Sequence, residues 1–162
     1  MRHVLLTVAV ALVLAGCGQD SGGSASASTS GTERDYSEPM PRWYDVSQVR
    51  QGAEIYTAEC AECHGKKAQG AADWQEPLPN GAYPPPPLNG DGHGWHHPLP
   101  ALFYVVKNGS PGGKGNMPAW GKELSDDEIL ATIAWFQSRW PEKVYRQWVR
   151  IDHRARKQNG PG

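Results

Sequence analysis

The chain has 162 residues and a formal net charge of −1, with 16 lysine and arginine residues against 17 aspartate and glutamate residues. This length suits one domain, or one domain with tails, and the balanced charge gives no support to a nucleic-acid-binding protein. Apolar residues make up only 38% of the chain, whereas 19 glycines and 14 prolines are present. Such a composition is typical of a small, loop-rich fold whose core needs more than its own side chains.

The N-terminus has the pattern of an export signal. A short basic start precedes an apolar run over residues 4–15 that is too short to span a bilayer comfortably. The run ends in Leu-Ala-Gly-Cys17, which resembles the lipobox of bacterial lipoproteins. The resemblance implies that residues 1–16 are a signal peptide and that cleavage leaves a diacylated Cys17. The alternative is an ordinary signal peptide in which the position of Cys17 is accidental. Both interpretations predict an exported protein.

A low-complexity segment follows the cysteine. Residues 18–32 are nearly all serine, glycine, alanine and threonine, and residues 33–42 add charges and two prolines. Such a stretch cannot bury enough apolar surface to offset its ordering entropy, so it predicts a flexible tether. We therefore expect a lipidated cysteine and tether over 17–42, a folded domain over 43–140, and a basic helical extension with a tail over 141–162.

Helix signals occur at both ends of the folded part. The predicted helices cover residues 45–60, 98–108, 125–140 and 141–157. Asp45 or Ser47 can cap the first helix, and Gly109 is a C-cap for the second. Ser125 and Glu128 have the spacing of a capping box at the start of the third. Because no strand pattern of useful length is present, the predicted fold class is all-α.

The middle of the chain is a long loop. Between Gly65 and Gly115, prolines at 77, 79 and 84–87 and repeated glycines prevent long regular elements apart from the short second helix. A loop of about fifty residues normally counts against an assignment of elements. It is accounted for if the loop encloses a large cofactor.

One short motif indicates which cofactor this is. Cys60 and Cys63 are three residues apart, and His64 follows directly. A thioredoxin-like disulfide belongs in a βαβ context, and a structural zinc site needs four ligands, usually from two paired clusters. Neither context is present, and a structural disulfide at this spacing would constrain little. Two such thiols can add to the two vinyl groups of one porphyrin while the histidine reaches the iron. We therefore predict one covalently bound haem c.

Residues 43–140 resemble a class I c-type cytochrome in its small bacterial monohaem form. Five features carry the resemblance and occur in the family's order: Gly52-x-x-x-Tyr56, Cys60-Ala-Glu-Cys63-His64, Pro86-Pro-Leu88-Asn-Gly90, Asn116-Met117-Pro118 and Leu124-Ser-Asp-Asp-Glu-Ile129. The resemblance implies a small class I cytochrome c fold, with helices and long loops wrapped around one haem. It also implies an electron carrier rather than an enzyme.

The resemblance assigns roles near the histidine. The carbonyl of Pro86 is expected to accept the Nδ1–H of His64, which fixes the ring and raises its basicity. Leu88 is expected to pack on the haem. Gly52 is expected to let the C-terminal helix of the domain approach closely, and Tyr56 to pack on an aromatic residue of that helix, Trp135 or Phe136.

The second axial ligand is predicted to be Met117. A thioether is a soft ligand that raises the potential of a haem iron. Of the other methionines, Met1 leaves with the signal peptide and Met40 lies in the predicted tether. Trp120 is expected to line the haem crevice or to bond a propionate.

Two further segments have more than one interpretation. His93, His96 and His97 suggest a haem-edge loop, with a copper or zinc site as the alternative. The C-terminal segment is rich in lysine and arginine. It predicts a solvated basic helix, or a surface that docks to an acidic partner or to phospholipid. Trp140 and Trp148 are expected to fold this segment back over the domain.

We therefore expect an exported monohaem cytochrome, on the periplasmic or cell-surface side, anchored to a membrane through Cys17. Its expected partners are redox proteins such as a quinol-oxidising complex or a terminal oxidase. One alternative is a haem-bearing subunit of a larger oxidoreductase. Another is a haem sensor or metal-handling protein that uses the loop from His93 to His97.

Overall fold

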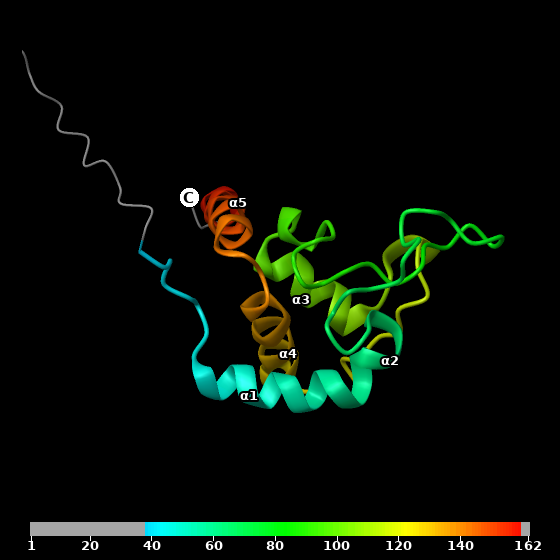
Figure 1. The fold of residues 1–162 in the computed structure, drawn as a ribbon, viewed down its shortest axis with the longest axis horizontal. Helices are drawn as coiled ribbons and strands as arrows, with labels where there is room; N and C mark the ends of the chain where they lie inside the picture. The colour runs from blue at the N-terminus through cyan, green and yellow to red at the C-terminus, as the bar shows by residue number, and fades with distance from the viewer. Residues whose placement is uncertain (1–37, 160–162) are drawn as a thin grey trace, which may run out of the picture. The chain divides into compact units, whose positions relative to one another are not determined.

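The structure is a computed structural model that describes residues 38–159. The predicted signal peptide, Cys17 and most of the predicted tether lie outside the described residues. The described part consists of helices joined by long loops (Figure 1). Its β pairing is limited to an isolated bridge between Tyr83 and Gly115. The all-α prediction is therefore confirmed.

All four predicted helices are present in the structure. In chain order, the elements are α1 (Val46–Ile55), a π-helical turn (Tyr56–Cys60), α2 (Ala61–His64), a 3₁₀ turn (Gly94–His96), α3 (Leu99–Asn108), a 3₁₀ turn (Pro111–Gly113), α4 (Asp126–Ser138) and α5 (Glu142–Asn159). The first helical stretch runs past its predicted end at Cys60. The Ala61 N–H donates to the Tyr56 carbonyl in a wider turn, which keeps the chain helical up to His64.

Two capping boxes begin α1 and α4. The Asp45 carboxylate accepts from the Gln48 N–H at 2.9 Å, and the Gln48 side chain accepts from the Asp45 N–H at 3.1 Å. Asp45 rather than Ser47 is therefore the N-cap of α1. At α4, the Ser125 hydroxyl accepts from the Glu128 N–H at 3.3 Å, and the Glu128 carboxylate accepts from the Ser125 N–H at 2.8 Å. The predicted capping box is confirmed.

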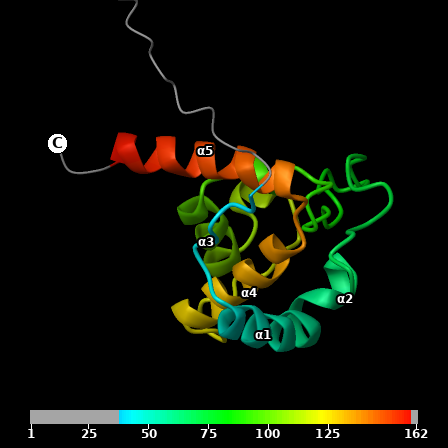
Figure 2. The same ribbon diagram turned by 60° about the vertical axis from the view of Figure 1, so that its left-hand side comes forward.

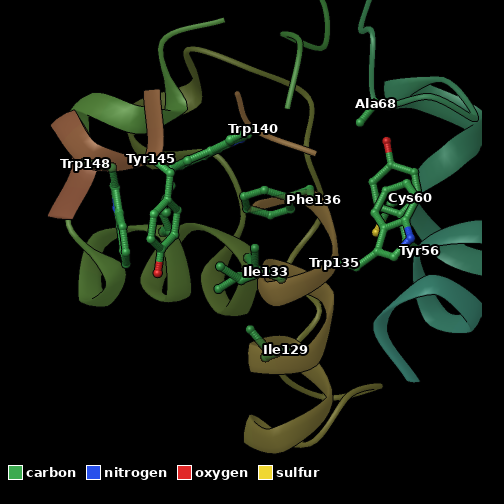
Figure 3. Packing of buried hydrophobic residues seen from close by; sticks show 12 residues of the cluster. Tyr56, Cys60, Ala68, Ile129, Ile133, Trp135, Phe136, Trp140, Tyr145 and Trp148 are labelled. Atoms are coloured by element: carbon green, nitrogen blue, oxygen red, sulfur yellow. The ribbon is translucent and has the colours of Figure 1, made fainter. Parts of the chain in front are cut away.

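Helices α1 and α4 pack closely because Gly52 has no side chain. A Cβ atom built on Gly52 would lie 1.9 Å from the carbonyl oxygen of Ala131. One turn later, the rings of Tyr56 and Trp135 are in contact, with their centroids 4.0 Å apart (Figure 3). Both expectations for this contact are confirmed, and Trp135 is the partner of Tyr56.

The C-terminal helix α5 shares the core with the rest of the domain (Figure 2). Tyr145 and Trp148 on α5 are buried, as is Trp140 just before it. The Trp140 Nε1–H donates to the Leu88 carbonyl at 2.7 Å, and the Trp148 Nε1–H donates to the His97 carbonyl at 3.0 Å. The predicted return of this segment over the domain is confirmed. A boundary at residue 140 would divide a continuous core.

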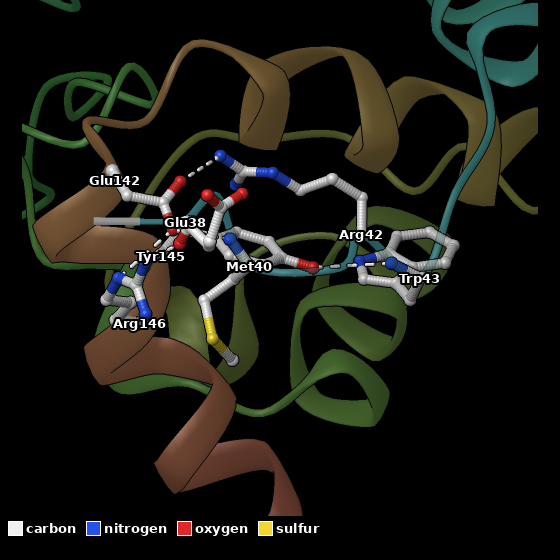
Figure 4. Close-up of polar contacts among 7 residues, drawn as sticks. All are labelled: Glu38, Met40, Arg42, Trp43, Glu142, Tyr145 and Arg146. Carbon is white, nitrogen blue, oxygen red and sulfur yellow. Dashed lines mark hydrogen bonds and ion pairs between the residues drawn. The ribbon is translucent and has the colours of Figure 1, made fainter. Parts of the chain in front are cut away.

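Residues 38–42, which the sequence places in the tether, pack against α5 (Figure 4). The Met40 N–H donates to the Glu142 carboxylate at 2.8 Å, and the Arg42 guanidinium binds the same carboxylate at 2.8 Å. The packed part of the chain therefore begins before Trp43. Composition could not show this, because the partners lie about a hundred residues away along the chain.

Within residues 38–159, no helix combines the length and the apolar character needed to cross a membrane.

Candidate haem site

The two cysteines and the histidine of the CxxCH motif lie on one helical stretch. Cys60 ends the π-helical turn, and His64 is the last residue of α2. Because residues three and four apart share a face of a helix, Cys60, Cys63 and His64 project to the same side. Both cysteines are free, Cys60 being buried and Cys63 exposed. Burial raises the pKa of the Cys60 thiol to about 11, so this thiol is neutral near neutral pH.

The imidazole of His64 is buried and oriented by one hydrogen bond. Its Nδ1 lies 2.9 Å from the carbonyl oxygen of Pro86. A carbonyl can only accept, so Nδ1 must carry the proton, and the neutral ring then has its lone pair on Nε2. Burial lowers the pKa of His64, and the bond to Pro86 partly opposes this effect. The ring is therefore held as a neutral ligand.

Backbone hydrogen bonds on both sides of Pro86 hold its carbonyl in place. The Ala71 N–H donates to the Pro85 carbonyl at 2.9 Å, and the Leu88 N–H donates to the Ala68 carbonyl at 2.8 Å. Gly70 lies between them with φ +67°, and a Cβ atom on it would lie 2.5 Å from the carbonyl carbon of Pro86. Only glycine combines this conformation with so close an approach. The proline run thus presents one defined carbonyl to His64.

Met117 lies on the loop before α4, half-buried against the hydrophobic core. Two hydrogen bonds tie its backbone to Ser110. The Met117 N–H donates to the Ser110 hydroxyl, and the Ser110 N–H donates to the Met117 carbonyl, both at 3.1 Å. Ser110 was not predicted from the sequence. The only signal for it was its position directly after Gly109, the C-cap of α3.

Four of the predicted site residues belong to one hydrophobic cluster or pack against it. Cys60 is a buried member of it, and Leu88, Met117 and Trp120 pack against it half-buried. His64 and Pro86 are joined directly by their hydrogen bond. Trp120 is anchored to α3, because its N–H donates to the Val106 carbonyl at 3.1 Å. Cys63 is exposed at the surface.

The histidine loop makes aromatic contacts. His93 stacks on Trp74 with ring centroids 5.5 Å apart, and His96 stacks on Trp95 at 3.6 Å. His97 contacts His93 edge to face at 5.6 Å. Nowhere in the described part of the chain do three or more histidine, cysteine, aspartate or glutamate side chains group as metal ligands would. The structure gives no support to a copper or zinc site in this loop.

Comparison with known proteins agrees with this geometry. Residues 47–136 match the family described as "Cytochrome C oxidase, cbb3-type, subunit III". The chain belongs to this family of c-type cytochromes. It is also 34% identical over 84 residues to cytochrome c6 of Bryopsis maxima, and the match covers 52% of this chain and 83% of that protein. No solved structure matches the chain significantly. The predicted class I cytochrome and its covalently bound haem c are therefore confirmed.

The residues of this cytochrome fit the group that its family binds. Haem c needs two thiols and a neutral imidazole nitrogen. The structure supplies two free thiols and an imidazole whose Nε2 carries a lone pair. Met117 carries a thioether, a soft donor, and packs against the hydrophobic cluster that contains Cys60.

Proposed function

We propose that this cytochrome is a membrane-tethered monohaem carrier of single electrons between redox partner proteins. Electron transfer itself follows from membership of the c-type cytochrome family. The observation that carries the proposal is the 2.9 Å hydrogen bond between His64 Nδ1 and the Pro86 carbonyl, directly after the cysteine pair. It fixes the orientation of the buried ring and leaves the lone pair on Nε2, as a permanent iron ligand requires.

In this proposal, Cys60 and Cys63 would attach the haem, and His64 and Met117 would ligate its iron. The bound haem supplies a one-electron couple whose potential depends on its axial ligands. Pro86 holds His64 in a single tautomer and orientation. Ser110 holds the backbone of Met117 on the loop before α4. Both ligands are thus held by the fold before any redox event, which keeps the rearrangement on electron transfer small.

Whether both axial positions of the haem iron are occupied by protein ligands distinguishes an electron carrier from a sensor or an enzyme. A carrier with both axial positions filled should have low-spin iron, and its reduced form should bind carbon monoxide poorly. Met117→Ala should open one position, lower the potential and admit carbon monoxide, while the haem stays covalently attached. Absorption spectra and carbon monoxide titration of both proteins measure this. High-spin wild-type iron that binds carbon monoxide readily would contradict the carrier function.

The proposed location is the outer side of a membrane, with Cys17 as the lipid anchor. The support is the lipobox-like end of the apolar run, followed by a segment of low complexity. The mature protein should fractionate with membranes and carry acyl chains on Cys17, and Cys17→Ser should prevent the acylation. Mass spectrometry of the N-terminal peptide tests the anchor. The proposed partners are a quinol-oxidising complex on the donor side and a terminal oxidase on the acceptor side.

A second candidate function is that of a haem-bearing subunit within a larger oxidoreductase. The family description, a subunit of a cytochrome oxidase, favours it. A subunit should remain with its complex through purification in mild detergent, in a fixed ratio. A carrier should separate from its partners and restore electron flow when it is added back. Native electrophoresis with haem staining distinguishes the two outcomes.

A further inference from the structure

The outward face of α5 carries a row of cations. Lys143, Arg150, Arg154 and Lys157 are all exposed, and spacings of seven, four and three residues place them on one side of the helix. Arg146 belongs to the same row and is half-buried. At 1.5 Å per residue the row is about 21 Å long. The opposite side of α5 is the one that enters the core.

This row lies on a helix of net positive charge, whereas the rest of the chain has a net negative charge. Helix α5 holds six basic and two acidic residues, a net charge of +4. Because the whole chain has a net charge of −1, the remaining residues sum to −5. Both acidic residues of α5 have partners away from the four exposed cations. Asp152 pairs with Arg156 at 2.6 Å, and Glu142 pairs with Arg42 and Arg146. The exposed row therefore keeps its positive potential.

The N-terminal segment joins the domain on the same helix (Figure 4). Glu142, the first residue of α5, binds the Met40 N–H at 2.8 Å and the Arg42 guanidinium at 2.8 Å. One turn later, Arg146 donates to the carbonyl of Glu38. An anchor on the chain upstream of Glu38 therefore limits the distance between itself and α5 more tightly than its distance to any other helix.

We propose that α5 lies on an anionic phospholipid surface, with its row of cations against the headgroups. The inference rests in part on the lipid anchor proposed for Cys17, which would keep the start of α5 within reach of the membrane. Once α5 is there, the cations meet lipid phosphates, and each lysine or arginine near such a surface strengthens binding about fivefold. In this orientation α2 lies away from the lipid, since it is remote from α5 in both ribbon views (Figures 1 and 2).

The composition of the face favours lipid over an acidic protein. Stable protein interfaces are centred on aromatic or apolar residues that become buried, with charges at the rim. The exposed large hydrophobic residues of the described part are Val46, Leu78, Tyr83 and Tyr104, and all lie outside α5. A row of cations without an apolar centre suits headgroups, which can move laterally to pair with it.

Lysine labelling of the acylated holoprotein in vesicles tests the proposal. In vesicles with roughly a third phosphatidylglycerol, an amine-acylating reagent should modify Lys143 and Lys157 severalfold more slowly than in vesicles of phosphatidylcholine alone. Lys122 is exposed and lies outside α5, so it should react equally in both. High salt should remove the protection, because it screens the surface charge.

A matched pair of variants separates the row from net charge. Arg150→Gln with Arg154→Gln should remove most of the protection of Lys143 and Lys157. Lys66→Gln with Lys67→Gln makes the same change of charge on exposed residues outside α5, and it should leave the protection intact. Neither pair touches the proposed haem ligands, so the haem spectrum should be unchanged in both.

Three results would overturn the proposal. The first is equal labelling of Lys143 and Lys157 in the two kinds of vesicle. The second is protection in native membranes but not in vesicles of their extracted lipids, which would assign the row to a protein partner. Flotation with neutral vesicles tests the acyl anchor separately from α5. If the chain carries no acyl group, holoprotein added to vesicles should still float with anionic vesicles and not with neutral ones. The third result is a failure of this unacylated protein to float with anionic vesicles, which would refute the role of α5.

Discussion

The carboxylate of Asp152 on α5 accepts a hydrogen bond from the Leu99 N–H at 2.8 Å, in the first turn of α3. Pro98, the residue at the N-cap position of α3, makes no side-chain cap. A residue 53 positions away along the chain therefore supplies the acceptor that a local serine or aspartate usually provides. Helix α5 caps α3 as well as packing on the core.

Asp152→Ala should lower the free energy of unfolding by roughly 1–3 kcal/mol, since it leaves the Leu99 N–H without its carboxylate partner. Denaturant titration of the holoprotein, followed by tryptophan fluorescence, measures this. Asp73→Ala is the control, because Asp73 is exposed on the loop. Equal stability of the two variants would show that the cap contributes nothing.

Ser110→Ala should weaken the hold on Met117, the proposed iron ligand, without removing its thioether. The variant loses one hydrogen bond to the Met117 N–H, which is worth about 1 kcal/mol. Carbon monoxide should then bind the reduced protein severalfold faster than it binds wild type. Ser138→Ala is the matched control, because its hydroxyl also makes a backbone bond, to the Trp135 carbonyl at 2.6 Å. Similar rates in the two variants would contradict a positioning role for Ser110.

Gly52→Ala should destabilise the protein by about 3 kcal/mol or more, because the new methyl group overlaps the Ala131 carbonyl of α4. Either the helices separate or the holoprotein fails to accumulate. Gly94→Ala should be nearly neutral, since a Cβ atom there meets its nearest neighbour, on Trp140, at 4.0 Å. Thermal unfolding and the yield of haem-containing protein measure both variants. A stable Gly52→Ala protein would show that α1 and α4 can pack differently.

The capping box of α4 predicts one component of the pH dependence of stability. Hydrogen bonds from the backbone and side chain of Ser125 hold the pKa of Glu128 below its usual value of 4.5. A group whose pKa is lowered by folding stabilises the protein above its unfolded pKa, and this contribution is lost as the pH falls through the folded pKa. Wild type should therefore exceed Glu128→Gln in stability at neutral pH, and the difference should shrink below pH 4.5 and vanish once the pH is below the lowered pKa of Glu128.

Denaturant titrations of both proteins over this pH range measure the difference. Asp45, at the other capping box, also has a lowered pKa but is present in both proteins, so its effect cancels. A difference that stayed constant with pH would contradict the assignment to Glu128.

Structural features that depend on residues close together in the sequence could be predicted, whereas contacts between residues far apart in the sequence could not. Ser125 and Glu128 are three apart, and their capping box was found. The CxxCH motif and the Pro86 carbonyl were also found, because a family pattern links them. The contact of Arg42 with Glu142 joins segments 100 residues apart, so the predicted tether ran too far. Ser110 was missed because a serine after a glycine is ordinary in any loop.

Trp140 and Trp148 also bear on the order in which the candidate haem site forms during folding. The loop that follows Pro86 is held through its carbonyls at Leu88 and His97, by Trp140 and Trp148. Trp140 and Trp148 lie 52 and 51 residues from these carbonyls, and contacts over such separations form late in folding. We therefore expect the loop after Pro86 to become fixed only once α5 has packed against the domain. Until then Cys60, which is buried in the folded domain, should stay accessible to the machinery that attaches haem.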